Sequence, residues 1–323
     1  MNKPLRIIFM GTPGFAIPTL KALLDEGYDI AAVITAPDKQ GGRGKKILSS
    51  EIKQFAEKES GVPLVLQPTN LKDPGFISDL KKLAADLQIV VAFRMLPVQV
   101  WDMPPKGTIN LHASLLPQYR GAAPINHAII NGEKTTGVTT FYINDNIDTG
   151  KVILQKEIDI PTTFTAGNLH DTLMIEGAKL VIKTVKSIEE GTVEEIPQKD
   201  LIGKYNEIKT APKIFKEDCR IKWDDEVMNV YNFIRGLSPF PTAFSELSGQ
   251  GQMVSVKIFN ATYSISSHNY PAGKIFLENR KRMKVAVRNG FIYPEILQQA
   301  DKKSMDVINF INGFPDLENY FMK

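Results

Sequence analysis

The chain has 323 residues, of which 43% are hydrophobic, and its formal net charge of +3 is too small to indicate nucleic-acid binding by itself. Its length predicts two domains with a substantial core, and the single cysteine, Cys219, excludes an internal disulfide, so we expect a reduced, cytoplasmic protein. The longest apolar runs are only strand-sized, so we expect neither a secretion signal nor a membrane-spanning segment.

Residues 1–206 alternate short apolar runs with segments of helical periodicity. Strands are predicted at residues 5–10, 30–35, 64–66, 87–93 and 108–112, and helices at 16–24, 51–58, 76–83 and 166–190. Near-continuous apolar strands between amphipathic helices are what a parallel sheet covered on both faces requires. We therefore predict a doubly wound, Rossmann-like α/β domain over residues 1–206.

From about residue 208 onward, β-type runs are separated by turn residues. Strands are predicted at residues 243–246, 253–259, 284–287 and 291–296, and one helix at 227–235. Asn289-Gly290 between two β-type runs is a strong hairpin signal. The sequence thus predicts a second, smaller and mostly β domain, barrel-like, over residues 207–323.

Common cofactor motifs are missing. The turn Gly11-Thr12-Pro13-Gly14 lies where a dinucleotide fingerprint would be, but Pro13 stands where a second glycine should let a pyrophosphate approach. The segment 41–46 fits no phosphate-loop motif. Since the four histidines are scattered and no cysteine pair exists, we expect no metal site.

Polar residues at the end of the predicted strand 108–112 are the strongest candidate site. Strand alternation places Asn110 and His112 on one face, at the sheet edge where open α/β proteins bind ligands. Asp148 could raise the basicity of His112 and fix its orientation, and Asn110 could donate to an oxyanion. Such a set suits acyl transfer to an amine. Equally, these residues could be satisfied polar groups at a strand end and in an ordinary turn.

Three segments closely resemble the 10-formyltetrahydrofolate-dependent formyltransferases. They are Asn110 to Pro117 (NLHASLLP), Tyr119 to Pro124 (YRGAAP) and Asp148 to Gly150 (DTG). The opening at 9–13, the loop at 36–46 and the stretch 211–239 carry the resemblance along the whole chain. These segments resemble those of the family members that act on methionyl initiator tRNA. Arg94 and the three residues after it depart from the pattern near the folate pocket.

The resemblance implies a reaction and a set of residues. A formyl group would move from 10-formyltetrahydrofolate, the formyl-donor substrate, to the α-amino group of methionine on initiator tRNA. Asn110, His112 and Asp148 are implied as the catalytic residues. The residues implied to bind folate are Ser114, Leu115, Leu116 and Pro117.

The resemblance also implies where RNA is bound. The loop after the second strand would enter the acceptor stem, with Arg43 as its central contact and Lys45 and Lys46 beside it. The C-terminal domain would resemble an oligonucleotide-binding barrel. Its segment 274–288 holds six basic residues against one acidic residue, which makes Lys281 and Arg282 candidate tRNA contacts. We expect the chain to act as a monomer that binds no membrane.

Other functions stay open. A formyltransferase of the same fold could act on a small amine, such as a nucleotide-linked amino sugar or glycinamide ribonucleotide, with the same catalytic residues. The basic loop 42–46 argues against an amino-sugar enzyme, and the second domain argues against a glycinamide ribonucleotide enzyme. A non-catalytic RNA-binding protein is disfavoured by the intact Asn110, His112 and Asp148, and a nicotinamide oxidoreductase by the missing fingerprint.

Overall fold

The computed structural model describes residues 4–41, 46–314 and 316–323, which fold into two compact units. The N-terminal unit comprises the chain up to Gly121 together with residues 136–158 and 170–210. The C-terminal unit comprises residues 122–135, 159–169 and 211–323. Two short segments that precede residue 170 therefore help to build the C-terminal unit. The division into domains at residues 206 and 207 stays a prediction.

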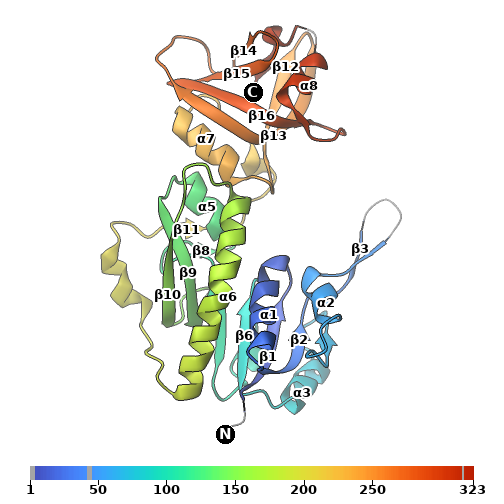
Figure 1. The fold of residues 1–323 in the computed structure, drawn as a ribbon, viewed down its shortest axis with the longest axis vertical. Coiled ribbons are helices and arrows are strands. Elements are labelled where there is room, and N and C mark those ends of the chain that lie inside the picture. The colour runs from blue at the N-terminus through green and yellow to red at the C-terminus, as the bar shows by residue number, and fades with distance from the viewer. Residues whose placement is uncertain (1–3, 42–45, 315) are drawn as a thin grey trace. The chain divides into compact units, whose positions relative to one another are not determined.

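A seven-stranded sheet forms the centre of the N-terminal unit (Figure 1), in the order β10-β9-β7-β6-β1-β2-β5. Its strands are β1 (Arg6–Gly11), β2 (Asp29–Ile34), β5 (Val65–Leu66), β6 (Leu87–Val91), β7 (Thr108–His112), β9 (Thr135–Tyr142) and β10 (Val152–Asp159). The five strands β7, β6, β1, β2 and β5 run parallel to one another, whereas β9 is antiparallel to β7. The predicted parallel core is confirmed, and the edge beyond β7 makes the sheet mixed.

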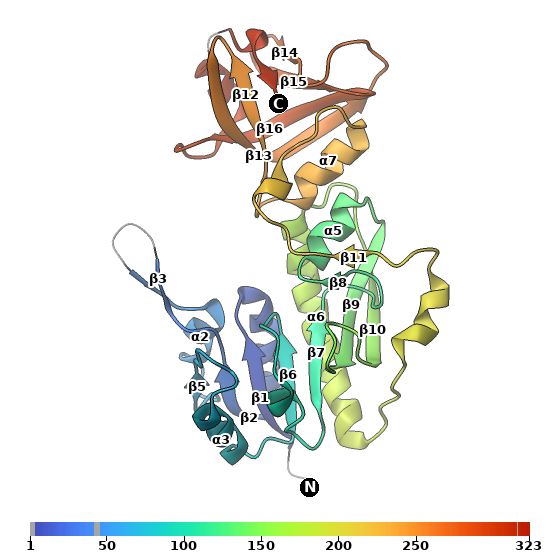
Figure 2. The same ribbon diagram turned by 180° about the vertical axis from the view of Figure 1, so that it is seen from behind.

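Helices cover both faces of this sheet, as the doubly wound prediction required. The helices of the first 190 residues are α1 (Ile17–Asp25), α2 (Glu51–Ala56), α3 (Pro74–Lys82), α4 (Val98–Trp101), α5 (Pro124–Ile130) and α6 (Ala166–Glu190). Ile8 and Met10 of β1 pack with Leu80 of α3 and Val100 of α4 on one face. Figure 1 shows α1 and α6 in front of the sheet, and Figure 2 shows its strands from the other side.

The C-terminal unit contains an antiparallel, partly closed barrel. Its strands are β12 (Ala243–Gly249), β13 (Gln252–Ile265), β14 (Ile275–Glu278), β15 (Arg282–Val287), β16 (Gly290–Gln299), β17 (Met305–Asp306) and β18 (Phe321–Met322). A backbone bridge between Lys274 and Phe321 joins its two ends. A hairpin forms near the predicted Asn289-Gly290, but its two loop residues are Arg288 and Asn289, since Val287 pairs with Gly290. Helices α7 (Val227–Gly236) and α8 (Val307–Asn312) belong to this unit, as does α5 from the earlier part of the chain.

Short elements make up the rest of the chain. They are the strands β3 (Lys39–Gly41), β4 (Lys46–Leu48), β8 (Arg120–Gly121) and β11 (Thr210–Ala211), and 3-10 helices at Gly14–Ala16, Gln198–Lys204, Glu217–Cys219 and Leu317–Asn319. In the ranges that the structure describes, no helix is both long and apolar enough to cross a bilayer.

After α6, the chain returns along the edge of the N-terminal sheet; we call residues 192–209 the return segment. Ile196 and Val152 of β10 exchange two backbone hydrogen bonds, of 2.8 and 2.9 Å. The following 3-10 helix buries Leu201 against Leu116 and Phe141. This packing attaches the return segment to the loop that follows β7.

Replacing Leu201 by Ala tests this attachment. Leu201 is 6% exposed, so its truncation should lower the free energy of unfolding by about 2–5 kcal/mol through reduced burial and a residual cavity. Its neighbour Ile202 is 43% exposed, and Ile202→Ala should change the value by no more than about 0.5 kcal/mol. Urea unfolding followed by circular dichroism measures both. Equal effects of the two substitutions would contradict the attachment.

Candidate active site

His112 ends β7, and its buried imidazole is held by a backbone carbonyl. Nε2 of His112 lies 2.9 Å from the carbonyl oxygen of Tyr119. Because a carbonyl oxygen can only accept a hydrogen bond, Nε2 carries the proton. In the neutral imidazole Nδ1 is then unprotonated. The lone pair of Nδ1 is therefore the group that can take a proton from a substrate.

Asp148 faces that free nitrogen. Its Oδ2 lies 3.8 Å from Nδ1 of His112, which is too long for a hydrogen bond but close enough to stabilise a positive imidazolium. The same oxygen accepts a hydrogen bond of 2.9 Å from the backbone N–H of Gly121. From the sequence we expected the Asp148 carboxylate to orient the imidazole. In the structure the carbonyl of Tyr119 orients it instead.

Asn110 lies two residues before His112 on the same face of β7 and is half-buried. Among the residues whose placement is described, none forms a hydrogen bond with its side-chain amide. An amide that has no protein partner and lies beside a general base can donate to an oxyanion that develops there. The structure therefore brings His112 and Asp148 together and leaves Asn110 available next to them.

The side chains expected to bind folate are largely packed into the protein. The hydroxyl of Ser114 donates to the carbonyl of Gln118 at 2.6 Å, and Leu116 lies in the core cluster with Leu201. Pro117 is buried and Leu115 is half-buried. These four residues shape the loop between His112 and Tyr119. Their role in binding folate stays a prediction.

The turn after β1 gives a further argument against a dinucleotide site. The backbone N–H of Gly14 donates to the carboxylate of Glu51, which begins α2. A pyrophosphate bound at this turn would need the same N–H and would be repelled by that carboxylate. A carboxylate in this place disfavours the oxidoreductase alternative on electrostatic grounds.

Arg94, which departs from the family pattern, is used within the N-terminal unit. Its guanidinium donates to the carbonyls of Pro68 and Thr69, the latter at 3.0 Å. Burial lowers the pKa of this guanidinium from its ordinary value. Its Nε is buried and has no partner within the described parts of the chain. Arg94 thus holds the segment before α3 in place.

Of the basic loop predicted to bind RNA, Arg43 and Lys45 lie outside the described residues, and the same holds for the side chain of Lys46. The flanking strands β3 and β4 form an antiparallel hairpin, in which Lys39 pairs with Leu48. Nearby, Lys53 forms an ion pair of 2.7 Å with Asp38, and that hydrogen bond holds the pKa of the Asp38 carboxyl below its usual range. Lys53 is therefore not a free cation for RNA.

The basic segment 274–288 is less positive than its composition suggested. Lys284 pairs with Glu278 at 2.8 Å, while Lys274 and Arg288 donate to backbone carbonyls. Lys281 is exposed at the turn between β14 and β15, and Arg282 stacks on the ring of Tyr293 with 4.0 Å to its centroid. The freely exposed charge is thus concentrated at this turn.

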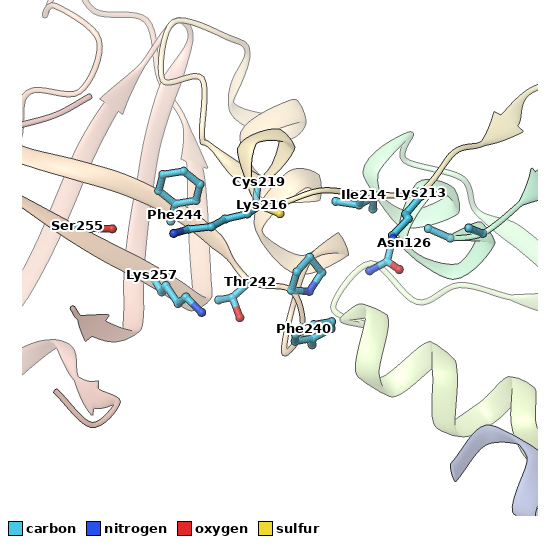
Figure 3. Close-up of a pocket in the computed structure, with 13 residues that line it drawn as sticks. Asn126, Lys213, Ile214, Lys216, Cys219, Phe240, Thr242, Phe244, Ser255 and Lys257 are labelled. Atoms are coloured by element: carbon cyan, nitrogen blue, oxygen red, sulfur yellow. The ribbon is translucent and has the colours of Figure 1, made fainter. Parts of the chain in front are cut away.

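A cavity of about 540 Å³ lies in the C-terminal unit (Figure 3). Lys213, Lys216 and Lys257 line it together with Phe240, which is 81% exposed. Across the described ranges of the chain, no acidic side chain forms an ion pair with these three lysines. Sequence reasoning missed this cluster because Lys257 lies on β13, far along the chain from the other two.

Comparisons with known proteins agree with this geometry. Residues 5–185 match the formyl transferase family, and residues 213–315 match the formyl transferase C-terminal domain. The chain is 49% identical to the methionyl-tRNA formyltransferase of Parabacteroides distasonis, over 99% of this chain and 98% of the relative. It is 51% identical to that of Bacteroides thetaiotaomicron, over 99% of each. The chain belongs to the methionyl-tRNA formyltransferase family.

Solved structures share the fold of this methionyl-tRNA formyltransferase family member. An N-formyltransferase from Helicobacter canadensis, in complex with folinic acid and dTDP-3-aminofucose, has a TM-score of 0.64 at 19% identity and covers 90% of this chain and 98% of that one. HypX from Aquifex aeolicus, in complex with tetrahydrofolic acid, has a TM-score of 0.64 at 18% identity and covers 96% and 47%. At such identities these likenesses show the fold alone.

Replacing Gly150 by Ala tests how tightly the turn that carries Asp148 is packed. A methyl group added at Gly150 would lie 1.6 Å from the carbonyl oxygen of Tyr142, so Gly150→Ala must displace the turn. We expect the free energy of unfolding to fall by about 1–3 kcal/mol and formyl transfer to fall with it. Gly203→Ala is the control, because nothing lies within 4 Å of the added methyl group. Unchanged transfer by a folded Gly150→Ala variant would contradict the placement of this turn.

Proposed function

We propose that this protein transfers the formyl group of 10-formyltetrahydrofolate to the α-amino group of methionine esterified to initiator tRNA. The observation that carries the proposal is the hydrogen bond between Nε2 of His112 and the carbonyl of Tyr119, which leaves Nδ1 facing the carboxylate of Asp148 beside the free amide of Asn110. The near 50% identity over full length to methionyl-tRNA formyltransferases supports the acceptor. The cytoplasmic location and the monomeric state remain expectations.

The reaction follows from these three side chains. The amine attacks the formyl carbon as the free base, and the carbonyl becomes a tetrahedral oxyanion to which the Asn110 amide donates. Nδ1 of His112 takes the proton that the attacking nitrogen loses, and Asp148 stabilises the resulting imidazolium. The bond between the formyl carbon and N10 of the folate then breaks, and the proton on His112 passes to N10. The products are formylmethionyl-tRNA and tetrahydrofolate.

We assign folate to the loop formed by residues 114–117, beside His112. Since the side chains of Ser114 and Leu116 are already packed, and the carbonyls of residues 114–116 already accept hydrogen bonds within the protein, the group that this loop offers to the ligand is the half-buried side chain of Leu115. The folate is a co-substrate that leaves after each turnover. Its N10 must reach Nδ1 of His112 to accept the proton.

The choice of acceptor separates this proposal from an enzyme of the same fold that acts on a small amine. Purified protein is incubated with 10-formyltetrahydrofolate and with methionyl initiator tRNA, methionyl elongator tRNA or a nucleotide-linked amino sugar. Formylmethionine should be recovered from initiator tRNA and only weakly from the elongator. Formylation of the amino sugar alone would overturn the proposal.

Replacing His112 by Ala should lower kcat by roughly 100- to 10,000-fold, because the proton acceptor is removed. The affinity for tRNA should not change, since the imidazole is buried. His170→Ala is the matched control, because this half-exposed imidazole packs on Phe15 and bonds with its neighbour Asp171. Steady-state kinetics and a filter-binding assay measure the two effects. Equal losses of binding and turnover would indicate a structural role for His112.

For tRNA we propose the loop with Arg43, Lys45 and Lys46, and on the C-terminal unit either the turn with Lys281 and Arg282 or the cavity lined by lysines. Exposed cations without acidic partners release counterions when they bind phosphate, and an exposed aromatic ring such as Phe240 can stack on a base. The two C-terminal sites consist of different residues, so each can be tested by its own substitutions.

Removing either pair of charges should raise KM for tRNA and flatten its dependence on salt. We expect the slope of log affinity against log salt to fall by about 0.7–0.9 for each phosphate group that the variant no longer neutralises. The variants are Lys281→Ala with Arg282→Ala, and Lys213→Ala with Lys257→Ala. Lys82→Ala is the matched control, since Lys82 is exposed and already paired with Asp79. A salt slope that equals the control's would exclude that site.

A further inference from the structure

Gln198, the first residue of the 3-10 helix in the return segment, bonds to both sides of the active site. Its Nε2 donates to the carbonyl oxygens of Asp148, at 2.9 Å, and of Gly150, at 2.8 Å. Its Oε1 accepts from Nε and Nη2 of Arg120, at 3.0 and 2.6 Å. Gln198 is 4% exposed. Both N–H groups and both lone pairs of the amide are thus used within the protein.

These bonds close a ring around His112 and Asp148. Tyr119, Arg120 and Gly121 are consecutive: the carbonyl of Tyr119 holds the imidazole, and the N–H of Gly121 holds the carboxylate. Arg120, between them, is held by Gln198, which also holds the backbone of Asp148. The separation between Nδ1 and Oδ2 therefore depends on a side chain that touches neither atom.

We propose that Gln198 is a positioning residue for formyl transfer, which keeps the Asp148 carboxylate opposite Nδ1 of His112. This inference rests on the proposed function. Asp148 has a φ of 53°, a left-handed conformation that residues other than glycine rarely adopt. The two bonds from Nε2 hold the carbonyls on either side of Thr149 and so keep the turn in that conformation. Without them the turn relaxes and the imidazolium loses its partner.

A side chain at this position must donate two hydrogen bonds and accept two, which requires an amide of this length. A carboxylate would place an oxygen against the carbonyls of Asp148 and Gly150, and an apolar side chain would release Arg120 as well. The charged groups that face the site from the packed segments are Asp148 and Arg120, and the Arg120 guanidinium lies within electrostatic range of Asp148. Loss of Gln198 therefore perturbs both charges at once.

The test compares Gln198→Met with Gln88→Met in the full chain. Methionine fills a similar volume but makes no such hydrogen bonds. Gln88 is also buried, and its Oε1 accepts a bond of 3.1 Å from Thr108, at the other end of β7 from His112. Two readouts are measured: kcat and KM for methionyl-tRNA, and the imidazole chemical shifts of His112 by NMR of ¹³C-labelled histidine. The His112→Ala spectrum assigns the resonance.

In Gln198→Met we expect kcat to fall roughly 10- to 100-fold, as for a displaced catalytic group, with KM for tRNA unchanged. The chemical shifts of the His112 imidazole should change, because the carboxylate that faces Nδ1 at 3.8 Å moves away from the ring. In Gln88→Met neither readout should change. Gln198→Asn keeps the amide but cannot reach both sides, so it should shift both readouts in the same direction and less far.

Unchanged kcat and unchanged His112 chemical shifts in a folded Gln198 variant would overturn the proposal, and so would equal changes in Gln88→Met. The NMR readout needs no substrate. If the wild-type protein does not formylate methionyl-tRNA, the proposed function fails, while changed His112 chemical shifts in Gln198→Met would still show that the ring of hydrogen bonds positions Asp148. The two failures are therefore distinguishable.

Discussion

The hydrogen bond between Nε2 of His112 and the carbonyl of Tyr119 decides how this active site works. It leaves the lone pair of Nδ1 directed toward Asp148, so that one nitrogen is bound to the protein and the other is free for proton transfer. The bond exists because the loop after β7 folds back on itself within seven residues. Ser114 and Leu116 stabilise that fold, the first through a hydrogen bond to Gln118 and the second through the core.

The backbone is strained at two places to maintain this geometry. Tyr119 binds Nε2 of His112 through its carbonyl, and the carboxylate of Asp148 faces Nδ1. Both residues have left-handed φ values, 57° for Tyr119 and 53° for Asp148. Each such residue costs about 1–3 kcal/mol and persists only when its surroundings over-determine it. The surroundings here come largely from the return segment: the carbonyl of Lys209 accepts from the N–H of Tyr119 at 2.7 Å, and Gln198 holds the turn at Asp148.

Much of the fold could be predicted because its signals are local. The long helix over residues 166–190 has the bounds that its apolar stripe predicts, and a hairpin forms within one residue of the predicted Asn289-Gly290. The antiparallel strand β9, between β7 and the edge strand β10, was not predicted, because its threonines conceal the apolar pattern of a strand. The hairpin of β3 and β4 lies in a segment whose glycines indicated a loop.

The candidate site was only partly predictable for a related reason. Asn110, His112 and Asp148 were found because polar residues stand out at a strand end and in a matched motif. Gln198 carries no such signal: its partners lie 50 and 78 residues away, in a segment without periodicity. Likewise, the ion pair of Lys284 with Glu278 depends on strand pairing, so the composition of residues 274–288 overstated the charge available to RNA.

The most direct test of this account is the tautomer of His112, read from ¹⁵N chemical shifts of the imidazole at a pH above its titration. The account predicts that Nε2 is protonated and Nδ1 is not, and that Nδ1 gains the proton on acidification. A neutral form protonated at Nδ1 would contradict it, because Tyr119 would then not orient the ring and the nitrogen that faces Asp148 could not accept a proton from the substrate.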